Sequence, residues 1–329
     1  MVVSYEPDRD MLMQLVERLV GTAEVLIVDN SESEAGVTSA AAVGRAYGCA
    51  VLRNPRNMGV AVAQNLGLRA ARLRGFRYAL LLDQDSYPEA GTIDVLVRSL
   101  ESLRASGERV AAVGASHVDP RNGSRYPFVR LRRVRMRKVW PEAGTSIACD
   151  MLISSGCLIA LDTLDDIGEM DADLFIDYVD FEWCRRAASK GYRVFAVADA
   201  RMHHTIGDQS FCALGRSFNL HGPLRQYYFI RNALLFMRKP YLSLRWRAHL
   251  AYRVGGQLVL FSVFAPERVR RLGWMLRGLV DGLRGRAGRL GGPDGLASKR
   301  PISIAATPTP AAAPTERAPA MTGEVLSAD

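Results

Sequence analysis

The chain has 329 residues, 48% of them hydrophobic, which suffices for one large domain or two modest ones and excludes global disorder. The formal net charge of +9 is uneven, because residues 225–300 hold sixteen basic residues against three acids, a net of +13, and the remainder carries −4. No Cys-x-x-Cys pair, signal-peptide pattern or apolar run of about 18 residues occurs, so we expect reduced thiols in a cytoplasmic protein without a spanning helix.

The first half of the chain alternates short apolar runs with amphipathic segments. This pattern predicts strands at 2–5, 24–30, 50–54, 78–85 and 109–115, and helices at 10–20, 38–47, 60–74 and 91–104. Such alternation predicts right-handed crossovers and an α/β fold with a mostly parallel sheet. Ligands of open α/β sheets bind at the carboxyl ends of strands, where Tyr5, Asp29, Asn54 and Asp83 fall.

The second half of the chain is less regular. We expect one or two strands in 151–161 with a bend at Gly156, a helix in 175–191 with an acidic start and a basic end, and a strand at 192–197. Beyond Arg225, aromatic and basic segments predict amphipathic helices. From about Gly285 the sequence turns to Gly, Pro, Ala and Thr, a composition that cannot bury a core.

The stretch "LLLDQDSYP" places Asp83 and Asp85 at the exit of an apolar strand. Buried carboxylates are costly without partners, whereas at a strand end both can face a crevice. Mg²⁺ and Mn²⁺ favour carboxylate oxygens and share their remaining positions with water and substrate phosphates. The alternative is that Asp85 or Ser86 simply caps the following turn.

Other phosphate-binding patterns fit the sequence less well. It contains neither the G-x-x-x-x-G-K-[ST] loop nor a G-x-G-x-x-G motif after a strand. Phosphatases of the haloacid dehalogenase type also begin with an apolar strand and Asp-x-Asp, but they need a later Lys and an acidic pair. After Lys190 the aspartates are isolated, so we keep this class as a minor alternative.

Three further segments carry candidate chemistry. Asp180 and Glu182 follow an apolar–aromatic stretch and could supply a general base, or could instead pair with Arg185 and Arg186 at helical spacing. "MHHTIGD" at 202–208 could add a metal or diphosphate contact. "LRQYYFIRN" at 224–232 could cover phosphates and a sugar, or form a core or membrane-facing helix.

Together these segments resemble glycosyltransferase family 2, and most closely its rhamnosyltransferase branch. The matching pieces occur in family order and cover roughly residues 1–235: "VSYEP", "LIVDNSE", "RNPRNMGVAVAQNLGL", "LLLDQDSYP", "SSGCLI", "FIDYVDFEWCRRAASKGY", "HHTIGD" and "RQYYFIRN". The resemblance implies a GT-A fold, a Mg²⁺ or Mn²⁺ cofactor, a nucleotide-sugar donor and inversion at the anomeric carbon.

The resemblance also implies roles for single residues. Asp180 matches the catalytic base, and its preceding residue is Val179 where most of the family has an acid. The metal ligands are then Asp83, Asp85 and His204. Besides Asp83 and Asp85, the donor-site residues that match the family are Ser4, Tyr5, Glu6, Asp29, Asn57 and Gly59, and we add Gln84, Arg225, Tyr228 and Arg231 as further candidates. The acceptor-site candidates are Gly156, Asp177, Glu182 and Trp183.

The resemblance completes a functional hypothesis. We expect a GT-A catalytic domain at 1–235 (a nucleotide-binding half at about 1–115 and an acceptor half at about 116–235), a basic amphipathic extension at 236–290 and a disordered, dispensable tail at 291–329. The expected reaction moves L-rhamnose from dTDP-L-rhamnose to a hydroxyl of a bacterial surface glycan or lipid-linked acceptor. Another hexose donor or a non-catalytic glycolipid-binding protein are the alternatives.

The expected partners follow from the basic extension. Basic amphipathic helices lie in membrane interfaces, so we expect peripheral attachment at the cytoplasmic face of the membrane and no nucleic-acid partner. Apolar and aromatic residues accompany the arginines here: Trp246, Tyr252, Phe261, Phe264, Trp274 and Met275. The same helices could instead pack on the catalytic domain or form a homodimer interface.

Overall fold

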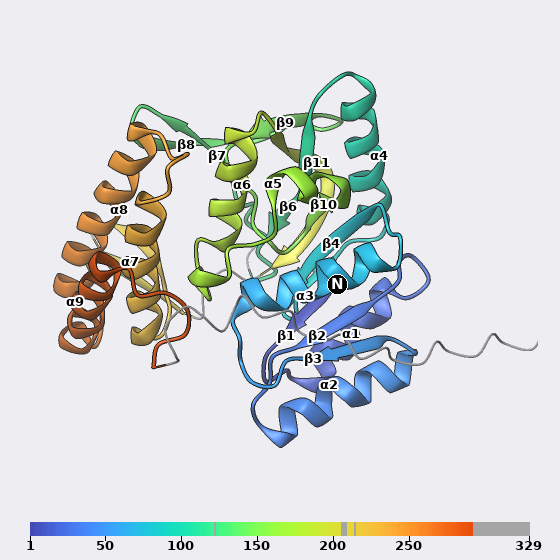
Figure 1. Cartoon of the computed structure of the whole chain (residues 1–329), viewed down its shortest axis with the longest axis horizontal. Helices are drawn as coiled ribbons and strands as arrows, with labels where there is room; N and C mark the ends of the chain where they lie inside the picture. The colour runs from blue at the N-terminus through green and yellow to red at the C-terminus, as the bar shows by residue number, and fades with distance from the viewer. Residues whose placement is uncertain (122, 205–208, 214, 292–329) are drawn as a thin grey trace, which may run out of the picture.

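A computed structural model describes residues 1–121, 123–204, 209–213 and 215–291, to which all structural statements refer. Its centre is one mixed sheet with helices on both faces and a layer of three long helices at one side (Figure 1). The expected tail lies almost wholly outside the described residues, as does 205–208, the end of the "MHHTIGD" segment.

The N-terminal half forms the parallel part of the sheet, as the alternating pattern predicts. Its strands are β1 (Val2–Ser4), β2 (Leu26–Asp29), β3 (Ala50–Arg53) and β4 (Tyr78–Asp83), in the spatial order β3-β2-β1-β4. The connecting helices are α1 (Arg9–Leu19), α2 (Glu34–Tyr47), α3 (Val60–Leu73) and α4 (Thr92–Ala105). Helix α2 starts earlier than expected because the Ser33 side chain caps the amide of Gly36, and it ends at Gly48 in the left-handed conformation.

The second half completes the sheet mostly with antiparallel strands. These are β5 (Ser86–Pro88), β6 (Val110–Val118), β9 (Ser146–Cys149), β10 (Cys157–Ala160) and β11 (Arg193–His204). Strand β10 lies antiparallel between β4 and β6, while β11 runs parallel to β6 and antiparallel to β5 and β9. The sheet is therefore more mixed than the sequence predicts, because these strands pair over long sequence distances that a local pattern does not reveal.

The second half of the chain also contains two β-hairpins and several short helices. The hairpins are β7 (Phe128–Arg132) with β8 (Arg135–Val139), and β12 (Gln209–Ala213) with β13 (Arg216–Leu220). The helices are η1 (Leu161–Thr163), α5 (Leu164–Ile167), η2 (Ala172–Leu174) and α6 (Val179–Ser189). The helix expected over 175–191 thus begins only at Val179, and residues 175–178 before it form a loop.

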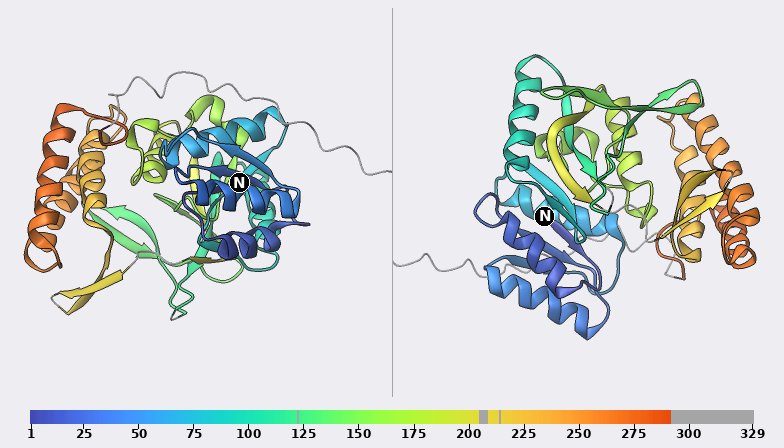
Figure 2. Two further views of the ribbon diagram at one scale, coloured as in Figure 1. Left: turned by 90° about the horizontal axis from the view of Figure 1, so that it is seen from below. Right: turned by 180° about the vertical axis from the view of Figure 1, so that it is seen from behind.

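Three helices form the layer beside the sheet: α7 (Pro223–Met237), α8 (Leu244–Val263) and α9 (Arg268–Arg284). Helix α9 packs so closely on α7 that a Cβ at Gly278 would lie 2.5 Å from the carbonyl oxygen of Tyr227. The tip of the β7–β8 hairpin reaches α8, where His249 Nδ1 lies 2.9 Å from the carbonyl oxygen of Val134 (Figure 2). Helix α7 therefore belongs to this layer, and the boundary expected after residue 235 falls in its last turn.

Candidate active site

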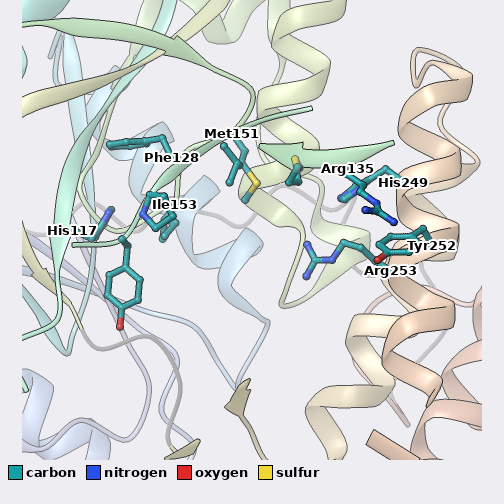
Figure 3. Close-up of a pocket in the computed structure, with 12 residues that line it drawn as sticks. His117, Phe128, Arg135, Met151, Ile153, His249, Tyr252 and Arg253 are labelled. Atoms are coloured by element: carbon teal, nitrogen blue, oxygen red, sulfur yellow. The ribbon is translucent and has the colours of Figure 1, made fainter. Parts of the chain in front are cut away.

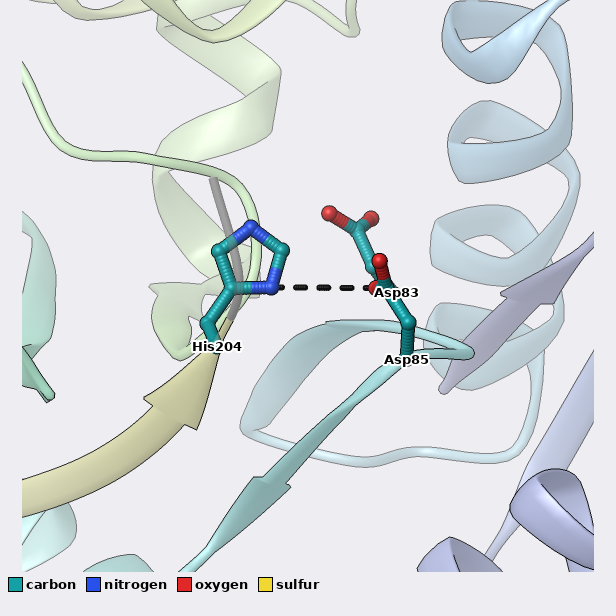
Figure 4. Close-up of side chains that lie close together, drawn as sticks. All are labelled: Asp83, Asp85 and His204. Atoms are coloured by element: carbon teal, nitrogen blue, oxygen red, sulfur yellow. Dashed lines mark ion pairs between the residues drawn. The ribbon is translucent and has the colours of Figure 1, made fainter. Parts of the chain in front are cut away.

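Two aspartates and a histidine meet at the end of β4. Leu80, Leu81 and Leu82 are buried in the sheet, so the strand delivers Asp83 and Asp85 to its carboxyl end. Antiparallel pairing of β5 with β11 sets His204 opposite Ser86, next to Asp85. Ligand atoms of the three side chains all lie within 4.8 Å of one another, and His204 Nδ1 is 3.7 Å from a carboxylate oxygen of Asp85 (Figure 4).

The chemistry of this cluster suits a divalent cation. Burial raises the pKa of Asp83; the charges of His204 and Arg225 act against that rise, and the Asp85 carboxylate adds to it. The buried Nδ1 of His204 has no hydrogen-bond partner among the described residues. Two carboxylates and an imidazole nitrogen without a hydrogen bond, all facing one space, fit Mg²⁺ or Mn²⁺, which accept such ligands.

Asp180 lies in the first turn of α6. One carboxylate oxygen accepts the Phe181 amide at 2.7 Å, and the other accepts the Ser154 amide at 3.3 Å. Burial raises the pKa of Asp180 to about 6 despite these two hydrogen bonds, and the nearby carboxylates of Asp83 and Asp177 add to the rise. A carboxylate with a pKa close to neutrality is suited to accept a proton from a substrate hydroxyl.

The loop that leads into α6 has an unusual backbone. Phe175, Asp177 and Tyr178 all have positive φ angles, between 62° and 64°, although none is glycine. Asn232 on α7 donates its side-chain amide to the carbonyl oxygens of residues 174, 176 and 177 at distances of 2.7, 2.6 and 3.1 Å. A positive φ at a non-glycine residue costs about 1–3 kcal/mol, so α7 holds the loop before Asp180 against its local preference.

The opposite wall comes from the first strands. Ser4 donates to Asp29 Oδ1 at 3.0 Å, and both residues are buried. Glu6 accepts the amides of Glu32 and Ser33, both at 2.9 Å, and the Ser33 hydroxyl. The hydroxyl hydrogen bond, followed by the two amide hydrogen bonds, lowers the pKa of Glu6. These contacts arrange the turn after β1 at the same sheet edge as Asp83.

Tyr5 and Asn57 complete this wall. The side chain of Gln84 accepts the Tyr5 amide at 2.8 Å and donates to the Tyr5 carbonyl at 3.2 Å, while the Tyr5 side chain is half-exposed. Asn57 accepts the Gly59 amide at 2.9 Å. Gly59 has a φ of +88°, and a Cβ there would lie 2.5 Å from the Phe175 carbonyl oxygen. The turn at Asn57–Gly59 therefore packs directly against the loop before Asp180.

Arg225 joins the two sides. Its guanidinium contacts the Asp177 carboxylate at 3.1–3.2 Å, and its charge acts to lower the pKa of Asp83. Asp177 is thus held by an ion pair rather than left free for an acceptor.

Other residues expected at the site have structural positions. Arg231 is 1% exposed and donates to the carbonyl oxygens of Leu174 and Gly288, so it is not available to phosphates. Tyr228 is buried, stacks on Phe175 and accepts the Leu290 amide. In this structure both side chains hold loops in place from inside the protein.

Three expected acceptor residues are likewise inside the protein. Glu182 is 1% exposed and pairs with Arg186 at 2.8 Å, and the buried Trp183 ring donates to the Gly168 carbonyl at 2.9 Å. Gly156 hydrogen-bonds within the sheet, donating to Leu81 at 2.8 Å and accepting from Ala115 at 3.0 Å. These residues support the site without facing its space.

Two contributors were not expected from the sequence. Asn232, which holds the loop before Asp180, directly follows Arg231 in "RQYYFIRN". The sequence marks the arginines and tyrosines of this motif as candidates, but it does not mark Asn232. His117 on β6 is buried, its Nε2 lies 2.7 Å from the Ser155 carbonyl oxygen, and its ring centroid is 5.9 Å from that of His204. No sequence signal marks His117, because only the strand register brings it there.

Two comparisons with known proteins show which sequences this chain is similar to. Residues 2–154 match the model for glycosyl transferase family 2. The chain is 29% identical over 294 residues to a dTDP-rhamnosyl transferase of Shigella flexneri, covering 87% of this chain and 95% of the relative.

Solved structures show the same fold at low identity. A mannosyltransferase from Pyrobaculum calidifontis, solved with GDP-Man and Mn²⁺, aligns with a TM-score of 0.52 at 13% identity over 86% of this chain and 85% of its own. Residues 1–349 of S. aureus TarS align with a TM-score of 0.54 at 13% identity over 85% and 80%. The fold is of the GT-A type, and the family match together with the curated relative makes the protein a glycosyltransferase. Within that class, residues 2–154 are similar to glycosyltransferase family 2, and the chain as a whole resembles a member of its rhamnosyltransferase branch.

Proposed function

We propose that the protein is an inverting, metal-dependent rhamnosyltransferase that uses dTDP-L-rhamnose as donor and a glycan or lipid-linked hydroxyl as acceptor. The choice of donor is supported by the similarity to the Shigella flexneri dTDP-rhamnosyl transferase over most of both chains. The main support for the proposed catalysis is the position of Asp180 beside the cluster of Asp83, Asp85 and His204.

The cluster would hold the divalent cation. When bound, such an ion neutralises negative charge on the donor diphosphate as it leaves. Arg225 adds positive charge from the other side, since it acts on Asp83 across the same space. The wall formed by Ser4, Tyr5, Glu6, Asp29, Asn57, Gly59 and Gln84 would bind the nucleotide.

Asp180 would act as general base in its ionised form. Its carboxylate takes the proton of the acceptor hydroxyl, and the oxygen bonds to the anomeric carbon as the bond to the diphosphate oxygen breaks on the opposite side. This single displacement inverts the configuration. The hydrogen bonds from the Phe181 and Ser154 amides fix the carboxylate orientation.

Helices α8 and α9 of the three-helix layer would attach the enzyme to the cytoplasmic face of the membrane. None of the described helices has the length and apolar character to cross a bilayer. Trp246, Phe261 and Met275, expected to face the membrane, are buried. Exposed apolar side chains instead cover the outer surface of the two helices: Leu244, Val259, Val263, Phe264, Val269, Leu272, Leu276, Val280 and Leu283.

Charge favours a bilayer over a second copy of this chain as the partner of α9. Its arginines include Arg268, Arg277 and Arg284, all exposed, while its single acid, Asp281, is buried and bonded to Tyr227 and Arg286. Two such helices would place like charges together, whereas anionic lipids would complement them.

A donor panel tests the proposal. Purified protein with Mn²⁺ should release nucleotide diphosphate from dTDP-L-rhamnose faster than from dTDP-glucose, UDP-GlcNAc or GDP-mannose, and the product should have the inverted anomeric configuration. A clear preference for another sugar would favour the alternative donor, and absence of turnover with all of them would favour a binding protein.

A further inference from the structure

The turn at Ser154 and Ser155 lies between the aspartate–histidine cluster and Asp180. The Ser154 amide donates to the Asp180 carboxylate at 3.3 Å. The Ser155 hydroxyl oxygen accepts the Asp83 amide at 3.1 Å. Asp83 is also close enough to Asp180 for its charge to raise the pKa of that carboxyl. Because the two serines are consecutive, a displacement of this turn would disturb the surroundings of Asp83 and Asp180 together.

A third serine strengthens the link to Asp83. The Ser86 hydroxyl donates to the Asp83 carbonyl oxygen at 2.9 Å and also bonds to the Ser155 hydroxyl. Since the Ser86 hydrogen is engaged, the Ser155 hydroxyl supplies the hydrogen of that second bond. Ser86 and Ser155 are both buried, so water does not compete for these bonds. Ser155 is thus bonded, directly and through Ser86, to the backbone on both sides of Asp83.

Sheet pairing does not hold Ser155 directly. Strand β10 begins at Cys157, which pairs with Leu81 of β4. Between them, Gly156 donates to the Leu81 carbonyl oxygen at 2.8 Å and has a φ of +80°, a conformation that glycine adopts readily. Support at Ser155 itself comes from a side chain.

His117, on β6, supplies that support. Its Nε2 lies 2.7 Å from the Ser155 carbonyl oxygen, and the residue is 4% exposed. Burial lowers the pKa of His117 to about 4, so at neutral pH the ring is uncharged and its Nε2 hydrogen is donated to Ser155. The amide of Tyr126 donates to the His117 carbonyl oxygen at 2.9 Å, which fixes the backbone from which the ring extends.

The ring of His117 also borders a cavity and the His204 ring. Figure 3 shows His117 at the end of this cavity, which has a volume of about 760 Å³, away from α8. Part of the ring therefore faces open space, so its hydrogen bond to Ser155 contributes strongly to its orientation. The centroid of the His204 ring lies 5.9 Å away at an interplanar angle of 64°. An ordered His117 ring thus limits the positions of His204 as well.

We propose that His117 is a positioning residue for glycosyl transfer: its ring holds the turn at Ser155, and through this turn it fixes Asp83 relative to Asp180. The inference rests on the proposed function, because a metal ligand and a base that act on one reaction need a fixed separation. It assigns a role to a buried histidine that the proposed mechanism does not otherwise use.

Three variants of the full-length protein test the proposal. His117→Leu removes the hydrogen bond. His117→Gln places a side-chain amide near the former position of Nε2, whereas His117→Asn carries the same amide on a shorter side chain that does not reach Ser155. Binding of Mn²⁺ in the presence of dTDP is measured from the electron paramagnetic resonance signal of free Mn²⁺, which requires no turnover.

The expected effects appear in both metal binding and catalysis. His117→Leu and His117→Asn should weaken Mn²⁺ binding by about tenfold, the scale of one lost hydrogen bond. They should also lower kcat by about 10²-fold, because a displacement of about 1 Å has that effect on catalytic groups. His117→Gln should retain most of both properties.

His249→Leu is the matched control. The buried His249 ring also donates to a carbonyl oxygen, that of Val134 at 2.9 Å, but it lies on α8 at the other end of the cavity. This variant should lower the melting temperature about as much as His117→Leu and leave Mn²⁺ binding with dTDP unchanged. A role of His117 in stability alone would make the two variants behave alike.

Several results would overturn the assignment. They are a lower melting temperature in His117→Leu with unchanged Mn²⁺ binding and kcat, equal behaviour of His117→Gln and His117→Asn, and weaker Mn²⁺ binding in His249→Leu. A fall in kcat with unchanged Mn²⁺ binding would also overturn it, because the turn would then act on Asp180 alone. If His117→Leu does not fold, the comparison of His117→Gln with His117→Asn decides.

The wild type separates this inference from the proposed function. If the wild type binds Mn²⁺ with dTDP and turns over dTDP-L-rhamnose, and the variants equal it, the positioning role alone is wrong. If the wild type turns over no nucleotide sugar, the proposed function fails, and the role of His117 in transfer fails with it.

Discussion

Replacing Asp180 by asparagine should make the protein more stable and nearly inactive. Burial holds the pKa of Asp180 at about 6, against 3.8 for an ordinary aspartate. At 1.36 kcal/mol per pH unit, keeping this carboxylate ionised in the folded state costs about 3 kcal/mol. The asparagine side chain carries no charge, so that cost disappears. Its single oxygen cannot accept hydrogen bonds from both backbone amides, however, and the lost hydrogen bond lowers stability by about 1 kcal/mol. The expected net gain is therefore about 2 kcal/mol.

The pH dependence gives the sign of the effect. A folded-state pKa raised above the unfolded value means that wild-type stability falls as pH rises from about 4 to about 6 and then stays constant. Urea unfolding of metal-free protein should accordingly show a gain for Asp180→Asn that is larger at pH 8 than at pH 5. Turnover of the wild type should rise through about pH 6, and the variant should lose about 10²–10⁴-fold in rate.

Glu182→Gln is the matched control, because it neutralises another carboxylate two residues away. Glu182 is buried but paired with Arg186, so its loss should destabilise the fold by about 3 kcal/mol, the opposite sign. The reasoning is refuted if Asp180→Asn keeps more than about a tenth of the wild-type rate, or if it destabilises the protein at pH 8 as Glu182→Gln does.

Three more predictions concern the metal, the base loop and the outer helices. Asp85→Ala should abolish the Mn²⁺ dependence of dTDP binding in calorimetry while leaving the melting temperature nearly unchanged, because its side chain is half-exposed; unchanged affinity in Mn²⁺ contradicts the metal assignment. Gly59→Ala should lower stability more than Gly21→Ala by denaturant unfolding: both glycines have φ +88°, but only at Gly59 would a Cβ clash with Phe175. Leu276→Glu should reduce flotation with anionic liposomes at low salt, whereas Leu73→Glu, at another exposed site, should not. Equal flotation of the two variants would show that α9 does not contact the membrane.

The sequence predicts the first half of the fold well, because each of its elements is determined by local pattern. Strands β1 to β4 and their helices show alternation, caps and glycine stops that need no distant partner. The β7–β8 hairpin corresponds to alternating apolar and basic residues in "FVRLRRVRMRKV", a period of two that is typical of a strand. Strand β10 could not be placed, since its position between β4 and β6 depends on pairing with two distant segments.

The candidate site divides in the same way. Asp83 and Asp85 are neighbours in sequence, and their strand-end position follows from the leucines before them. His204 was linked to them by resemblance alone, and its position depends on the register of β11 with β5. Arg231 was given a donor-binding role because arginine suits phosphate, but composition cannot show that its guanidinium is buried among backbone carbonyls.

The bond between Asn232 and the loop before Asp180 has a consequence for the newly made chain. Ribosomes deliver the N-terminal strands first, so the nucleotide wall and Asp83 and Asp85 can assemble while α7 is still being synthesised. The loop before Asp180 has left-handed residues that α7 must hold, so its working shape forms only once Asn232 docks. A chain stopped before α7 would therefore hold Asp83 and Asp85 at their strand end but would lack both the working shape of the loop before Asp180 and the guanidinium of Arg225.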